Sequence, residues 1–173
     1  KRIFINDTKF LDWDDLEPID IIKLKNLKYL TTTSSEKDIH KYLESGLHGD
    51  TVITLENGEK VKLRNIKVND ILNYDERVIG VVKIETKEID RIVKYKFGTL
   101  LEIIGAPNLH FKDHDLGNFN TLNLAGEIQN KPKYLYHLIT DSGFFHIDGY
   151  KIRDYNSAIE NILDTHQKLQ YLF

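Results

Sequence analysis

The chain has 173 residues, contains neither cysteine nor methionine, and carries a formal net charge of −3 from 24 basic and 27 acidic side chains. This length can bury one good core and a second, small one, while the absence of cysteine excludes disulfides, thiolate metal sites and thiol nucleophiles. The near balance of charge predicts no strong electrostatic field that would attract nucleic acid. The short apolar runs predict a soluble protein without a membrane span or secretory segment. The start at Lys1 and the lack of methionine lead us to expect that residues upstream have been removed or lie outside this sequence.

The first part of the chain is predicted to contain strands, a linker and a short helix. Isoleucines separated by polar residues favour strands over 1–30, with a turn at the acidic stretch 12–15 that surrounds Trp13. Trp13 is interpreted as a turn anchor rather than a recognition surface. The Thr/Ser run at 31–35 predicts the linker, and apolar residues at helical spacing predict a helix over 36–45.

Strands dominate the region that follows, because β-branched and aromatic residues alternate there with polar ones. The Asn57-Gly58 pair predicts a hairpin turn, and the stretch 105–133, rich in Asn, Asp, Gly and Pro, predicts loops. An apolar stripe predicts a C-terminal helix over 157–173. The expected strands are 52–55, 61–63, 70–72, 77–85, 92–97, 100–104, 135–140, 144–148 and 150–153. The fold class predicted from these patterns is a mostly β domain bracketed by helices.

A series of short motifs stands in a particular order along this β region. They are Gly46-Leu47-His48-Gly49-Asp50-Thr51, the segment 64–72 with Asn69 where glycine is usual, the segment 101–110, Leu122-Asn123-Leu124-Ala125-Gly126-Glu127, and 136–152 closing at Tyr155-Asn156-Ser157. In this order they resemble the Hint domain shared by inteins and Hedgehog autoprocessing domains. The resemblance implies a horseshoe-shaped β domain over 46–156, with a flanking segment of strands and a short helix over 1–45 and a C-terminal helix over 157–173.

The same resemblance implies self-processing, with the protein's own flanking polypeptide as substrate and no cofactor. In the family, a Cys or Ser at the first position attacks the preceding carbonyl, a histidine polarises that bond, and a terminal Asn cyclises to cut the far side. Such chemistry needs the nucleophile within attack distance of the carbonyl, which a rigid β scaffold provides. The resemblance also implies that Gly46 and Asn156 lie close together.

The position that should carry the nucleophile is Gly46, which has no side chain. An acyl shift at the Ser45-Gly46 bond is therefore excluded as the sequence stands, and Ser45, one residue early, would face a different carbonyl. A natural loss of function and an engineered change that traps the precursor both remain open for Gly46. If the rest of the site is sound, Gly46→Cys is expected to restore slow cleavage.

Further departures from the family pattern affect the proton-transfer groups. Ala106 takes the usual Thr position, and Leu109 resembles an insertion that displaces His110 by one residue. In a strand that displacement turns a side chain to the opposite face, although His110 in a loop could still reach the site. Tyr155 replaces the histidine before the terminal Asn, and it can donate a hydrogen bond but is a poor proton carrier near neutral pH.

The Asn156-Ser157 pair is chemically intact and has two interpretations. Asn156 could cyclise and release Ser157 as a new amino terminus. Alternatively, Ser157-Ala158-Ile159-Glu160 matches a capping box that opens the last helix. The capping interpretation is favoured, because it explains the same residues without a proton relay.

A metal site is considered and not favoured. His110, Asp113 and His114 form an H-x-x-D-H motif whose residue types could bind zinc. The Gly and Asn residues that follow favour a solvated loop instead, and no further ligands are fixed in the sequence. His48 and His146 are expected to be packing or surface residues, so no metal and no cofactor are predicted.

Two functions from different classes follow from these observations. The first is an intein-like self-processing domain, degenerate or trapped and unable to splice, with residual cleavage at Asn156-Ser157. The second is a non-catalytic structural or interaction module inserted in a phage or viral particle protein, with particle proteins as partners and the cytoplasm or virion as location. The Lys, Ile and Asn-rich composition, typical of an AT-rich genome, suggests the viral context.

Overall fold

The structure, a computed structural model, describes residues 2–12, 46–87, 91–97, 100–107 and 124–158, together with Ile89 and Leu109. The helix expected over 36–45, the turn at 12–15 and most of the helix expected over 157–173 lie outside these residues. The elements are β1 (Arg2–Ile5), β2 (Thr8–Asp12), β3 (Leu47–His48), β4 (Val52–Thr54), β5 (Lys60–Lys62), the 3-10 helix η1 (Leu63–Asn65), β6 (Val78–Glu85), β7 (Val93–Phe97), β8 (Leu101–Gly105), β9 (Leu124–Glu127), β10 (Tyr134–Thr140), β11 (Phe144–Ile147) and β12 (Tyr150–Arg153).

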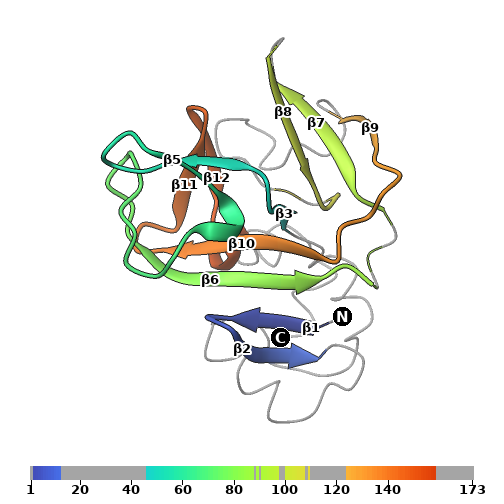
Figure 1. Cartoon of the computed structure of the whole chain (residues 1–173), viewed down its shortest axis with the longest axis horizontal. Helices are drawn as coiled ribbons and strands as arrows, with labels where there is room; N and C mark the ends of the chain where they lie inside the picture. The colour runs from blue at the N-terminus through green and yellow to red at the C-terminus, as the bar shows by residue number, and fades with distance from the viewer. Residues whose placement is uncertain are drawn as a thin grey trace, which may run out of the picture.

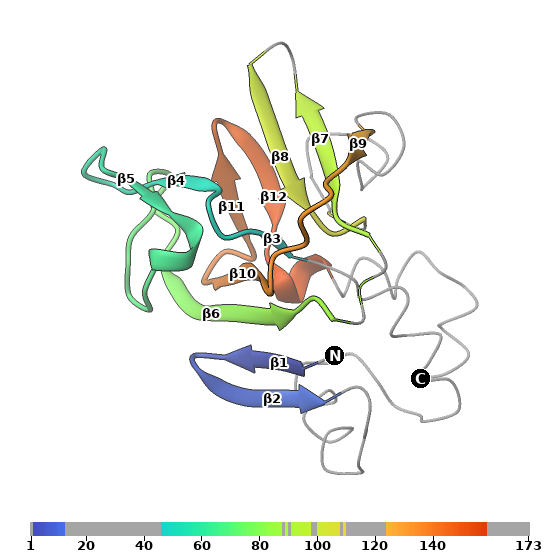
Figure 2. The same cartoon turned by 45° about the vertical axis from the view of Figure 1, so that its right-hand side comes forward.

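The predicted fold class is confirmed: the described chain is mostly β (Figure 1). Eight antiparallel strands form one sheet in the order β2-β1-β6-β10-β3-β8-β7-β9, and β4-β5 and β11-β12 form separate hairpins. In Figures 1 and 2 strands β7 and β8 run at a steep angle to strands β6 and β10. The sheet is therefore strongly bent, and the two hairpins lie beside the bend.

The central strands β6 and β10 bury one face because their side chains alternate between two sides of the sheet. Along β6, Val78, Val82 and Ile84 are buried, whereas Ile79 is 47% exposed. Strand β10 lies between β6 and β3 and is buried over most of its length. The fully buried core side chains of greatest volume are Tyr95, Tyr155, Phe145, Ile3 and Leu47.

The N-terminal hairpin belongs to this sheet. Strand β1 pairs antiparallel with β6, with Ile3 opposite Ile84. The β1-β2 turn consists of Asn6 and Asp7, both at positive φ, as a tight hairpin turn requires. The Asn6 backbone N donates to the Val81 carbonyl and the Val81 N donates to Asn6 Oδ1, both at 2.9 Å. Part of the segment before residue 46 is thus hydrogen-bonded to the strands after it.

The Gly-Asp-Thr sequence forms a tight turn between β3 and β4. The His48 carbonyl accepts hydrogen bonds from the Thr51 backbone N at 3.0 Å and from Thr51 Oγ1 at 2.6 Å. His48 Nδ1 accepts a further bond from the Asp50 N at 3.0 Å. A Cβ added at Gly49 would lie 2.9 Å from Tyr136 Cε2, so only glycine lets β10 approach this turn.

Three elements differ from the sequence predictions. The strand expected over 70–72 is reduced to two isolated bridges, because Asn69 adopts a left-handed conformation at φ 77° and turns the chain. Asparagine tolerates this region better than most residues other than glycine, which explains why it can stand at this turn. The third residue of the strand expected over 61–63 instead begins η1. Strand β9 lies inside the stretch expected to be loop-like, where it pairs with β7.

Candidate functional site

At the first candidate cleavage junction, Ser45-Gly46, the structure leaves no room for a side chain on the glycine. Gly46 is buried immediately before β3 at φ +121°, a conformation that L side chains rarely adopt. A Cβ at this position would lie 2.8 Å from Leu135 Cβ and 3.2 Å from Ile84 Cδ1. Both the backbone conformation and the contacts therefore exclude an unstrained cysteine or serine at this position.

The segment expected to supply a polarising side chain also holds Gly46 through its backbone. The Ala106 backbone N donates to the Gly46 carbonyl at 2.9 Å. The Tyr95 hydroxyl donates to the Ala106 carbonyl at 2.8 Å, and burial raises the pKa of Tyr95, so this donor stays protonated. Ala106 and Leu109 are fully buried. Leu109, expected to be an insertion, is a core residue, and His110 lies outside the described residues.

Tyr155 lies in the core next to a histidine that the sequence analysis did not single out. Its ring centroid is 6.0 Å from that of His137, whose ring also meets Phe145 edge-on at 5.6 Å. Burial raises the pKa of Tyr155, which makes its hydroxyl a weaker acid still. His137 is 1% exposed at an inward-facing position of β10. The strand alternation that predicts the inward face of β10 is the signal that could have identified it.

The second junction lies inside the first turn of a helix. Residues 155–158 are helical, and the carboxylate of Asp154 accepts a hydrogen bond from the Ser157 backbone N at 2.8 Å. Asp154 is the N-cap, so the expectation that Ser157 opens the helix as the first residue of a capping box is wrong. The cap falls at Asp154 because its other oxygen accepts a bond from the Thr140 N at 3.0 Å, which fixes the carboxylate to the end of β10.

Asn156 and Ser157 are both half-buried, and their contacts favour an intact bond. The Ser157 nitrogen, which would leave as an amine, is held by a carboxylate that accepts its hydrogen, whereas cleavage needs a group that donates one. The Ser157 hydroxyl accepts from Arg153 Nη1 at 3.1 Å. Asn156 Oδ1 is buried without a hydrogen-bond partner among the described residues.

Strand β10 connects the two junctions. A side chain at Gly46 would meet Leu135 near the start of this strand, and Asp154 binds Thr140 at its end. Tyr155 lies against His137, between these two points. The structure therefore attaches both sequence-predicted junctions to one strand, while the closeness of Gly46 and Asn156 stays a prediction.

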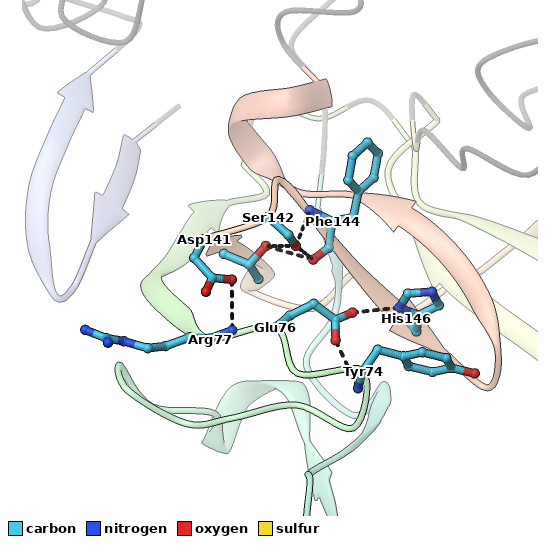
Figure 3. Close-up of polar contacts among 8 residues, drawn as sticks. Tyr74, Glu76, Arg77, Asp141, Ser142, Phe144 and His146 are labelled. Atoms are coloured by element: carbon cyan, nitrogen blue, oxygen red, sulfur yellow. Dashed lines mark hydrogen bonds and ion pairs between the residues drawn. The ribbon is translucent and has the colours of Figure 1, made fainter.

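A second cluster of polar side chains is centred on Glu76 and His146 (Figure 3). Glu76 is 4% exposed, and its Oε1 lies 2.6 Å from His146 Nδ1 on β11. Its other oxygen accepts from the Tyr74 backbone N at 3.1 Å, and the Tyr74 and His146 rings stack with centroids 3.8 Å apart. The cluster borders a cavity of about 330 Å³ that Asp148 also lines. No group of three or more metal-ligating side chains occurs among the described residues.

The Glu76-His146 contact connects the loop after Leu72 to the β11-β12 hairpin, so His146 has a specific partner as well as a packing role. We expect Glu76→Ala to lower the free energy of unfolding by about 2 kcal/mol, because it removes a buried charged acceptor from two donors. Urea unfolding would measure this loss. The control is Glu59→Ala, an exposed glutamate in the β4-β5 turn, which should change stability by less than about 0.5 kcal/mol. Equal losses in the two variants would contradict the assignment.

Comparison with known proteins gives similarity to solved structures and no match by sequence. No family model and no curated protein matches the chain. Among solved structures, the crystal structure of the gp41-1 intein is similar over 64% of this chain and 98% of that one, with 15% sequence identity and a TM-score of 0.49. Within the described residues, no helix combines the length and apolar character that crossing a membrane requires.

Proposed function

We propose that the chain is an intein-like Hint domain in a degenerate form, which keeps the β scaffold of a self-processing domain and has lost splicing. The ordered motifs of the sequence support the family, and the backbone roles of the Gly-Asp-Thr turn and of Asn69 fit it. The observation that carries the loss of splicing is Gly46, whose conformation and neighbours exclude a nucleophilic side chain.

The same geometry supports a natural glycine rather than an engineered one. A site built around cysteine or serine would leave space for the Cβ when glycine replaced it. At Gly46 that space is filled by Leu135, and the backbone adopts a φ that favours glycine. In this proposal the surrounding core has adapted to a residue that cannot start the reaction.

A second candidate function, a non-catalytic structural or interaction module, is supported by the N-terminal hairpin. Strand β1 pairs with β6, so a cut at Ser45-Gly46 would leave the preceding hairpin bound to the sheet. A processing domain gains nothing from a cut that releases no flank, whereas a structural module benefits from a continuous sheet. In this proposal the module belongs to a phage or viral particle protein and its partners are particle components.

The intact mass of the protein tests the proposal. We expect no fragment over several days at neutral pH and room temperature, because the described residues give neither junction both a nucleophile and a proton donor. Hydroxylamine, which cleaves esters and thioesters, should release nothing at Ser45-Gly46. Asn156→Ala serves as the control for the second junction. A fragment beginning at Ser157, abundant in the wild type and absent from Asn156→Ala, would contradict the proposal and identify a working C-terminal autoprotease.

A further inference from the structure

A cavity of about 650 Å³ lies where the turn of the N-terminal hairpin meets η1, β6 and β10. Arg64, Lys67 and Lys83 contribute its cations. Val68, Val81 and the Tyr136 ring contribute apolar surface. The volume falls within the range of small-molecule sites, which combine apolar walls with a few polar groups that fix orientation.

The charge at this cavity is opposite to that of the whole chain. The chain carries a net charge of −3, yet three cations line the cavity and Asp7 is the acidic residue among its lining groups. Neither Lys67 nor Lys83 forms a salt bridge among the described side chains, although the Asp70 carboxylate accepts a hydrogen bond from the Lys67 backbone N at 2.8 Å. Clustered cations that outnumber the carboxylates around them raise the local concentration of anions.

Arg64 has a partner at the rim of the cavity. It forms an ion pair with Asp50, and Lys62 Nζ lies 3.5 Å from the same carboxylate. Desolvation acts to raise the pKa of Asp50, but the charges of Arg64, Lys62 and His48 outweigh it and hold this pKa below its ordinary value. The rim thus contains more positive than negative charge even where a carboxylate is present.

Aromatic rings hold Lys83 of this cavity and the neighbouring Lys133 without neutralising them. Lys83 Nζ lies 4.3 Å from the centroid of the Tyr134 ring and 5.9 Å from that of Phe4, and Lys133 Nζ lies 5.3 Å from that of Tyr134. Such contacts orient an ammonium group and leave its charge available. A smaller cavity of about 160 Å³, lined by Lys133 and His48, shares Arg64 and Tyr136 with the larger one. The positive surface is therefore continuous across both.

We propose that this cavity binds a small phosphate-bearing ligand with an aromatic body, the chemical class of a mononucleotide. Arg64, Lys67 and Lys83 bind the phosphate, and the aromatic body packs against Tyr136 and the two valines. The cavity needs the N-terminal hairpin, whose Asn6 is hydrogen-bonded to Val81 at its edge. This binding goes beyond the proposed function, since it requires no cleavage at either junction.

Calorimetric titration of the whole chain at low salt tests the inference, with AMP, adenosine and inorganic phosphate as probes. We expect AMP to bind at least tenfold more tightly than adenosine, which lacks the charge, and than phosphate, which lacks the ring. Lys67→Gln and Lys83→Gln, on different elements, should each weaken AMP binding at least tenfold. Lys60→Gln is the matched control, because Lys60 is exposed on β5 and does not line the cavity.

Several results would overturn the inference. These are no binding of AMP, equal binding of AMP and either of the smaller probes, or an equal loss in Lys60→Gln and the two cavity variants. A short oligothymidylate distinguishes a free nucleotide from a nucleotide within a strand. If the oligothymidylate binds more than tenfold tighter than AMP, the ligand is a nucleic acid and the assignment to a small ligand is wrong.

Discussion

Gly46→Cys is expected to lower the free energy of unfolding by about 3 kcal/mol and to leave the Ser45-Gly46 bond uncut. A non-glycine residue in a rare backbone conformation costs about 1–3 kcal/mol, and inserting atoms into a packed core costs a similar amount. Both costs apply here, because φ is +121° and the new Cβ would lie 2.8 Å from Leu135 Cβ. This replaces the expectation from the sequence that cysteine restores slow cleavage. Urea unfolding and mass spectrometry after thiol treatment are the measurements.

A matched pair of alanine variants separates the two costs. Gly58 also has a positive φ, of +85°, but a Cβ added there meets nothing within 4 Å. Gly58→Ala should therefore cost about 1 kcal/mol for the conformation alone, and Gly46→Ala should cost clearly more. A Gly46→Cys protein as stable as the wild type and cleaved by thiols would show that the site still accommodates the nucleophile, and the proposal of a natural loss would fail.

The parts of the fold that the sequence predicted are those with local signals. The Asn57-Gly58 turn follows from the preference of this residue pair for hairpin turns. Strands β6 and β10 follow from the alternation of apolar and polar residues within each of them. The pairing of β1 with β6 and the addition of β9 to β7 depend on residues far apart in the chain, and the sequence analysis did not predict them.

In the candidate site too, local features could be predicted from the sequence, whereas contacts between residues remote in the chain could not. That Gly46 lacks a nucleophile is visible in the sequence, but the lack of space for a side chain there depends on Leu135, which is remote in the chain. Glu76 and His146 stand 70 residues apart, and nothing in either local sequence indicates that they pair. At the last helix the sequence predicts Ser157 as the capping residue, whereas the structure uses Asp154. Ser157 matches the capping box, yet the contact with Thr140 from another strand decides for Asp154.

Asp154→Ala is expected to lower the free energy of unfolding by about 3 kcal/mol. The carboxylate is 1% exposed and accepts from both the Ser157 and Thr140 nitrogens. Its removal leaves two donors without acceptors, each costing about 1–3 kcal/mol when buried. Asp141→Ala is the matched control. This exposed aspartate accepts one hydrogen bond, from the Arg77 N at 3.0 Å (Figure 3). Its replacement should lower the free energy of unfolding by less than about 1 kcal/mol.

Asp154→Ala also tests the second junction, Asn156-Ser157. Without Asp154 the Ser157 nitrogen loses the acceptor that caps the helix, but it gains no proton donor, so the Asn156-Ser157 bond should stay intact in the folded protein. Asp154→Asn, which keeps one acceptor oxygen, should recover about half of the lost stability. Urea unfolding and intact mass would be measured on all three variants. Release of a fragment beginning at Ser157 from Asp154→Ala alone would mean that the cap, rather than the missing proton donor, is what keeps this bond from being cut.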